Sequence, residues 1–209
     1  MELRDALDQI ADIRQQIARA QLFRGYRSLS TGATGVIAFV AAAVQASWIE
    51  APIDRIEQYL LVWVLAAFVS IVIVGTELAF RSWRSDRALD REMSLHAIEQ
   101  FLPCVVAGML LTIVIYEFAT VAAWMLPGLW AILFGLGVFA SRRLLPRATF
   151  LIGGWYLLAG LMMLAIGGRD LQNHHQTALA PWTMGITFGV GQLAAAAMLY
   201  LTLERDERR

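Results

Sequence analysis

Side chains that could do chemistry are rare within the apolar segments of the chain. The acids are Glu77 and Glu117, and the buried amides are Gln45 and Gln192. An ionisable side chain at membrane depth is a functional hypothesis by default, because it is costly to place there. A proton or solute carrier would bring at least two of these four side chains into one polar cavity at mid-depth.

Each of the four also has a structural interpretation. Glu77 can pair with Arg81, four residues later on the same helix. Glu117 becomes an exposed loop acid if the chain turns early after it. Both glutamines can hydrogen-bond between helices, which stabilises membrane bundles. The sequence leaves these alternatives open.

A second candidate is the histidine pair His174 and His175, with Asp170 close by in sequence. Such residues could bind a metal or sense protons, but a zinc site needs three or four ligands. Adjacent residues also point in different directions. We therefore predict no metal, and retain these three residues only as weak candidates. The single Cys104 excludes an internal disulfide.

Catalytic motifs are absent from the sequence. It contains no HExxH, GxSxG, P-loop or GxGxxG pattern. No serine–histidine or paired-aspartate arrangement falls at a common membrane depth. The sequence therefore favours a protein that is not an enzyme and that binds no cofactor.

Four arginines follow the second apolar segment, at positions Arg81, Arg84, Arg87 and Arg91. Spacings of 3, 3 and 4 put them on one face of a helix. They could contact an anionic lipid headgroup or an acidic partner, or act only as a topology signal that pairs with nearby acids. Because acids interrupt the run, it does not indicate nucleic-acid binding.

Small residues recur at helical spacing in the first and last apolar segments. Gly185 and Gly189 form a GxxxG pattern, and Gly32 and Gly35 begin a similar stripe. Such stripes allow two helices to approach closely. They predict tight packing within the chain or between copies, so a homo-oligomer stays open.

Apolar segments must position all these residues. The chain of 209 residues is 58% hydrophobic and 16% charged, against about 45–50% and 25% in soluble domains. This composition argues against a soluble enzyme. Because a spanning helix needs about 20 apolar residues, we predict an all-α, polytopic membrane protein with a six-span domain over 29–203 and a tail over 204–209. The predicted spans are 31–49, 59–80, 101–118, 120–141, 148–168 and 182–203.

The turn between the third and fourth spans is ambiguous. The chain can turn near 116–119, or at the dipeptide Pro127–Gly128. We expect a loose turn spread over 117–128. Both choices give the same topology.

Residues 1–28 predict an amphipathic helix. Leu3, Leu7, Ile10, Ile13 and Ile17 recur at spacings of 4, 3, 3 and 4, which places them on one face. The helix could bind a partner, or pack on the cytoplasmic side of the same chain and on the lipid interface.

Arginine placement predicts orientation. All 17 basic residues lie outside the predicted spans, and 15 of them fall on the side that holds both termini. By the positive-inside rule this side is cytoplasmic. That side sums to +3 and the other to −3, so the formal net charge of zero hides an asymmetry. We expect a multi-pass protein of the inner (plasma) membrane, N-in and C-in.

The sequence favours a non-catalytic interaction, assembly or regulatory module. Its expected partners are the lipid bilayer and a further copy or a membrane complex, with no nucleic acid. The alternatives are a small-solute or ion transporter, and a membrane enzyme or metal site on the outer face. We expect a structure to distinguish them by whether the polar side chains converge.

Overall fold

The computed structural model describes residues 28–84, 88–141, 149–170 and 176–204. Every regular element in these ranges is helical, and six stretches are long and apolar enough to cross a membrane. This confirms the predicted all-α class and indicates a multi-pass membrane protein. The amphipathic helix predicted at the start of the chain lies outside the described residues.

Each apolar stretch contains one long helix. The long helices are α2 (Ser28–Trp48), α3 (Ile56–Arg84), α4 (Ala88–Phe118), α5 (Leu126–Ala140), α6 (Thr149–Arg169) and α7 (Pro181–Leu199). Two short 3₁₀ helices, η1 (Thr120–Met125) and η3 (Gln176–Leu179), precede α5 and α7. A π-helical turn, η4 (Tyr200–Glu204), follows α7.

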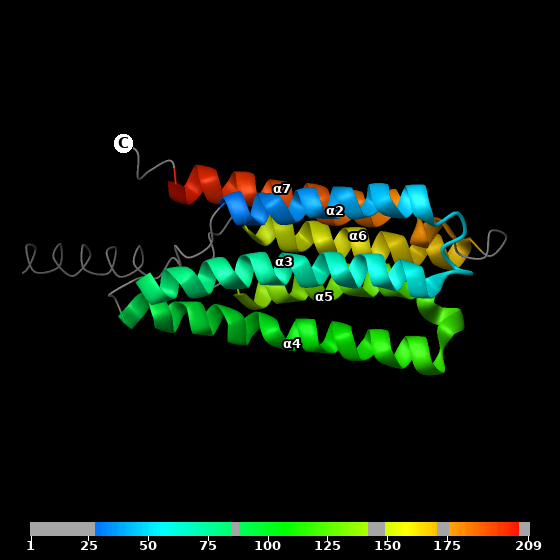
Figure 1. Ribbon diagram of the computed structural model, residues 1–209, viewed down its shortest axis with the longest axis horizontal. Helices are drawn as coiled ribbons and strands as arrows, with labels where there is room; N and C mark the ends of the chain where they lie inside the picture. The colour runs from blue at the N-terminus through cyan, green and yellow to red at the C-terminus, as the bar shows by residue number, and fades with distance from the viewer. Residues whose placement is uncertain (1–27, 85–87, 142–148, 171–175, 205–209) are drawn as a thin grey trace, which may run out of the picture.

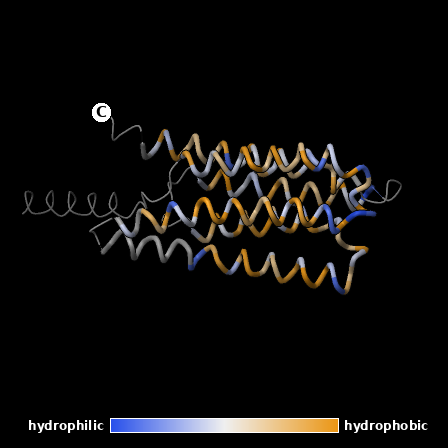
Figure 2. Tube along the Cα trace, viewed as in Figure 1, coloured by the Kyte–Doolittle hydropathy of each residue, from blue (hydrophilic) through white to orange (hydrophobic). Residues whose placement is uncertain are grey.

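The six long helices lie side by side and alternate in direction (Figure 1). We call the end of the bundle where α2 begins and α7 finishes the terminal end. The end that holds the α2–α3 and α4–α5 connections is the distal end. Hydropathy is highest along the middle of the helices and hydrophilic positions gather toward the ends (Figure 2).

The turn between α4 and α5 uses both of the signals in its sequence. Helix α4 ends at Phe118, and η1 leads into α5 at Leu126. Pro127 lies in the first turn of α5, where its missing N–H group would have had no helical acceptor. The connection therefore lies within 117–128, and Glu117 occupies the exposed last turn of α4.

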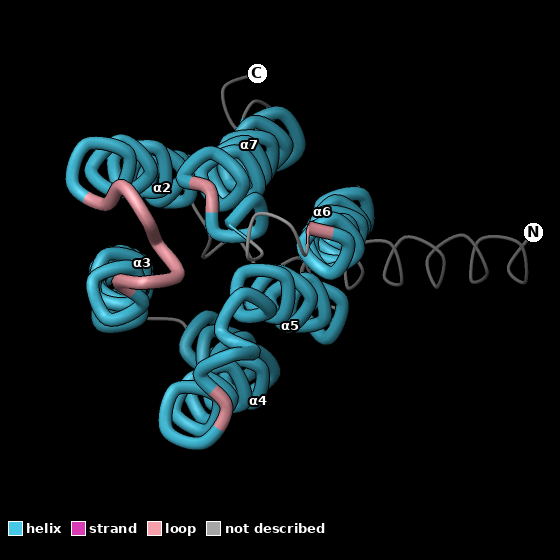
Figure 3. The backbone as a smooth tube through the Cα atoms, turned by 90° about the vertical axis from the view of Figure 1, so that its right-hand side faces the viewer, coloured by secondary structure: helices cyan, strands magenta, loops and turns pink. Residues whose placement is uncertain are grey.

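Four helices form the core and two flank it. Helix α2 packs along α7, and α5 packs along α6, with α6 and α7 joining the two pairs (Figure 3). Helix α3 is attached mainly to α2, and α4 mainly to α5. Eight residues of α2 are buried, whereas Ile115 is the one buried residue in the span Glu99–Phe118.

Small residues set the close pairing of the core helices. A methyl group added at Gly160 of α6 would lie 2.6 Å from the carbonyl oxygen of Gly128 in α5. One added at Gly135 would lie 3.0 Å from the carbonyl oxygen of Gly153. Real Cβ atoms essentially never lie as close as the first of these distances, and the second is tighter than nine in ten of their contacts. These helices can therefore pack at this distance only because glycine occupies both sides of the contact.

Candidate functional site

Gln45 is the centre of a buried polar cluster near the distal end. Its side chain is completely buried. The indole Nε1 of Trp63 on α3 donates a hydrogen bond to Gln45 Oε1 at 2.7 Å, and Gln45 Nε2 donates to the carbonyl oxygen of Leu179 at 2.7 Å. One amide thus joins α2, α3 and the η3 segment, which gives it a structural role between helices.

The other intramembrane polar candidates lie elsewhere in the bundle. Glu117 is exposed at the distal end, whereas Glu77 is partly buried in the terminal half of α3. Gln192, on α7, is partly buried and lies beside Gly35 of α2. The structure therefore does not bring these side chains and Gln45 into one polar cavity.

The glycines singled out in the sequence lie at the contact between α2 and α7. A methyl group on Gly35 would meet the carbonyl oxygen of Gly189 at 3.0 Å, and one on Gly185 would meet Cβ of Ala42 at 2.7 Å. Gly32 faces the same helix with more room, since its added methyl group would lie 3.6 Å from Cβ of Ala196. These small residues serve packing within one chain.

An aromatic cluster fills the bundle between α5, α6 and α7. The ring centroids of Phe134 and Tyr156 lie 4.6 Å apart, and those of Tyr156 and Phe188 lie 5.3 Å apart. Beside it, Trp155 Nε1 donates to the carbonyl oxygen of Thr187 at 2.9 Å. Sequence reasoning did not select these residues, because aromatic side chains are abundant in every span.

Two completely buried tyrosines present hydroxyl groups that have no hydrogen-bond partner among the described residues. They are Tyr59, in the distal part of the core, and Tyr156, in the aromatic cluster. An unsatisfied buried hydroxyl costs about 1–3 kcal/mol. Tyr59 belongs to α3 and Tyr156 to α6, two helices that do not pack against each other, so the two hydroxyl groups do not form a shared site.

The histidine and arginine candidates are described only in part. His174, His175 and Arg87 lie outside the described residues, and Arg81, Arg84 and Arg91 are described by backbone alone. Asp170 accepts hydrogen bonds at Oδ2 from the backbone N–H of Thr177, at 3.1 Å, and from its hydroxyl group. Among the described residues no three metal-ligating side chains group together.

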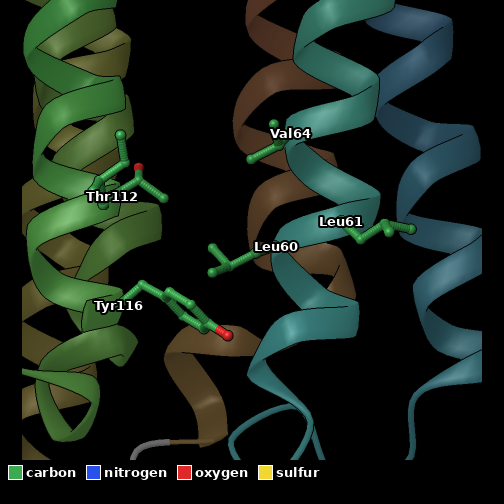
Figure 4. A pocket seen from close by; sticks show the side chains of 6 residues that line it. Leu60, Leu61, Val64, Thr112 and Tyr116 are labelled. Carbon is green, nitrogen blue, oxygen red and sulfur yellow. The ribbon is translucent and has the colours of Figure 1, made fainter.

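A shallow apolar groove of about 260 Å³, largely open to the side, lies between α3 and α4 near the distal end. Its walls are side chains of both helices: Leu60, Leu61, Val64, Thr112, Ile113 and Tyr116 (Figure 4). Sequence reasoning missed this groove, since it depends on how far apart two flanking helices stand.

Comparison with known proteins gives no relative from which a role could be carried over. No known protein family, curated protein or solved structure matches the chain. A role for the protein therefore has to follow from the geometry of the chain itself. That geometry comprises a tightly packed four-helix core, two flanking helices and a set of polar residues that do not converge.

Proposed function

We propose that the protein is a non-catalytic integral membrane module that assembles with an acidic partner protein through the terminal ends of α3 and α4. The observation that carries this proposal is the length of these two helices. The spans end at Phe80 and begin at Glu99, yet α3 continues to Arg84 and α4 begins at Ala88.

The extra length projects a helical hairpin beyond the bilayer. The 31 residues of α4 measure about 46 Å at 1.5 Å per residue, against a hydrocarbon core of about 30 Å. The hairpin carries Arg81, Arg84 and Arg91 on its helices, and Arg87 in the connection between them. Arginine residues favour acidic protein segments as partners, because guanidinium groups pair with carboxylates in a bidentate manner.

The arginine distribution supports a cytoplasmic position for this hairpin and for both chain termini, in an inner (plasma) membrane. The packing of the small-residue stripes within one chain supports the same proposal. With those stripes used internally, the projecting hairpin is a distinctive contact region that remains within the described part of the chain. The separation of Gln45, Glu77, Glu117 and Gln192 favours this role over transport.

The test compares complexes released from native membranes, measured as intact masses. We expect the wild-type protein to be found bound to a partner protein. The double variant Arg84→Glu and Arg91→Glu should shift it to the free chain, because it reverses the charge of the hairpin. The matched control, Arg55→Glu with Arg169→Glu, changes two arginines near the distal end and should leave the complex intact.

Two results would contradict the proposal. One is a wild-type protein that is released only as a monomer with bound lipid, which would favour an anionic-lipid contact at the arginines. The other is loss of the complex in both double variants, which would indicate a general charge effect.

A further inference from the structure

The groove between α3 and α4 is open to the side, within the depth of the spans. It lies near the distal end, since Leu60 is in the first turns of α3 and Tyr116 is in the last turn of α4. Leu60 points toward α4, and the ring of Tyr116 reaches across from α4 toward α3 (Figure 4). A narrow apolar molecule could therefore enter the groove between the two helices.

The exposed wall of the groove is carbon only, although two of its residues carry hydroxyl groups. Thr112 Oγ1 donates to the carbonyl oxygen of Gly108 at 2.7 Å and accepts from Trp130 Nε1 at 2.9 Å. Tyr116 donates its hydroxyl proton to Glu57 Oε1 at 3.0 Å. Because both hydroxyl groups are used elsewhere, the groove offers nothing to hold water, which needs two to four polar partners.

The distal rim of the groove is acidic. Glu57 accepts the hydrogen bond of Tyr116, and Glu117 follows Tyr116 in the sequence. Both glutamates are exposed. Among the described residues, the distal end of the bundle carries three further acids, Glu50, Asp54 and Asp170, against the two arginines Arg55 and Arg169. This charge repels an anionic headgroup and attracts an ammonium group.

The position and lining of the groove favour a lipid chain as its occupant. The groove is shallow and open to the side, and its exposed wall is apolar. The hydrocarbon core of a bilayer is about 30 Å thick, so acyl chains surround the spans and can enter the groove directly. An extended hydrocarbon chain therefore matches both its lining and its depth.

We propose that this groove binds one acyl chain of an aminophospholipid, whose ammonium group lies at the carboxylates of Glu57 and Glu117. The acyl chain fills the space between the two flanking helices, and the ammonium group of the headgroup pairs with the carboxylates of the acidic rim. This site lies at the distal end, so it is independent of the partner contact proposed for the terminal end. Either can fail while the other holds.

The test uses the full-length protein in vesicles made of equal parts phosphatidylethanolamine and phosphatidylglycerol. A trace of phosphatidylethanolamine with a photoreactive group in its acyl chain is added, and in parallel the same chain on phosphatidylglycerol. After irradiation, labelled residues are mapped by mass spectrometry. We expect labelling by the phosphatidylethanolamine probe to concentrate on the groove residues of α3 and α4, and to exceed labelling by the phosphatidylglycerol probe there.

Matched variants localise the effect. Ile113 lies in the groove and Ile186 lies on the outer surface of α7, and they are 50% and 48% exposed. Ile113→Trp should reduce groove labelling to the level of other exposed faces, whereas Ile186→Trp should leave it unchanged. Val64→Trp, on the opposite wall and also 50% exposed, should fill the groove from α3 and gives a second labelling result if Ile113→Trp folds poorly.

The rim is tested separately. Glu57→Gln keeps an acceptor for Tyr116 but removes the charge, and should lower the preference for phosphatidylethanolamine about twofold to fivefold, as expected for an exposed ion pair. Glu50→Gln, at the same end, should not. Uniform labelling of all exposed helices, equal labelling by the two probes, or equal effects of Ile113→Trp and Ile186→Trp would overturn the proposal, as would cross-linking of the groove to a second protein chain.

Discussion

Gln45 and Trp63 form a hydrogen bond between α2 and α3, in which the indole Nε1 donates to the amide oxygen at 2.7 Å. The same amide donates from Nε2 to the carbonyl oxygen of Leu179. The residue therefore uses its donor and its acceptor in two directions at once. A glutamine that is satisfied in this way holds together segments that are far apart in the sequence.

Gln45→Leu should destabilise the folded bundle by about 1–3 kcal/mol, because it leaves the indole N–H and the Leu179 carbonyl unsatisfied. Unfolding in mixed detergent measures this change. Gln192→Leu is the control, since Gln192 is only partly buried and makes no side-chain hydrogen bond to another described residue. A double-mutant cycle with Trp63→Phe should return a coupling of about 0.6–1.7 kcal/mol. A coupling of zero would show that the bond does not contribute.

Gly160→Ala should destabilise the protein by about 1–3 kcal/mol through overpacking. Its added methyl group would lie 2.6 Å from the backbone oxygen of Gly128, which cannot move independently of α5. Gly154→Ala, on the same helix, meets nothing within 4 Å and should be neutral or up to about 1 kcal/mol more stable. Equal effects of the two changes, measured by thermal unfolding, would contradict the α5–α6 contact.

Thr112→Val should loosen α4 from the core. The hydroxyl group of Thr112 accepts the hydrogen bond of Trp130 on α5, and its loss should cost about 0.5–1.5 kcal/mol. Thr76→Val is the matched control, because the exposed hydroxyl group of Thr76 bonds only carbonyl oxygens of its own helix. We expect faster proteolysis near α4 in Thr112→Val, and no change in the rate of proteolysis in Thr76→Val. Indistinguishable proteolysis would argue against this attachment.

The orientation can be read from single cysteines. Cys104 is the one cysteine of the chain, so Cys104→Ala gives a background without thiols. In intact cells, an impermeant maleimide should label Asp54→Cys and should label Arg84→Cys only after permeabilisation. These positions lie at opposite ends of α3. The reverse pattern would invert the predicted topology.

The number and class of the helices could be predicted from the sequence, because spanning segments must be long and apolar whatever they pack against. The six helical spans begin and end within three residues of the predicted bounds. Positions of charge define these bounds, as at Glu50 after the first span and Arg81 after the second. In water-soluble proteins the same accuracy is rare, since burial there is a matter of tertiary contact.

The pairing of helices could not be predicted in this way. Lipid is as apolar as a protein core, so an apolar face on α4 looks like an apolar face on α2. The side chain of Leu65 on α3 is 56% exposed, whereas that of Val62, one turn earlier on the same helix, is only 8% exposed. The partner of Gln45 was equally hidden, because nothing in the local sequence links it to Trp63 or to the carbonyl oxygen of Leu179.

The pairing of α2 with α7 has a consequence for how the bundle is made. The first and last of the described long helices are neighbours, with 132 residues between Trp48 and Pro181. At about 5–20 residues per second, the ribosome needs on the order of ten seconds to synthesise that stretch. During this interval the small-residue stripe around Gly35 lacks α7, the helix on which it packs. Helix α2 must therefore wait in the bilayer or at the insertion machinery. Assembly of the core is therefore completed late, when α7 arrives and closes the ring of helices.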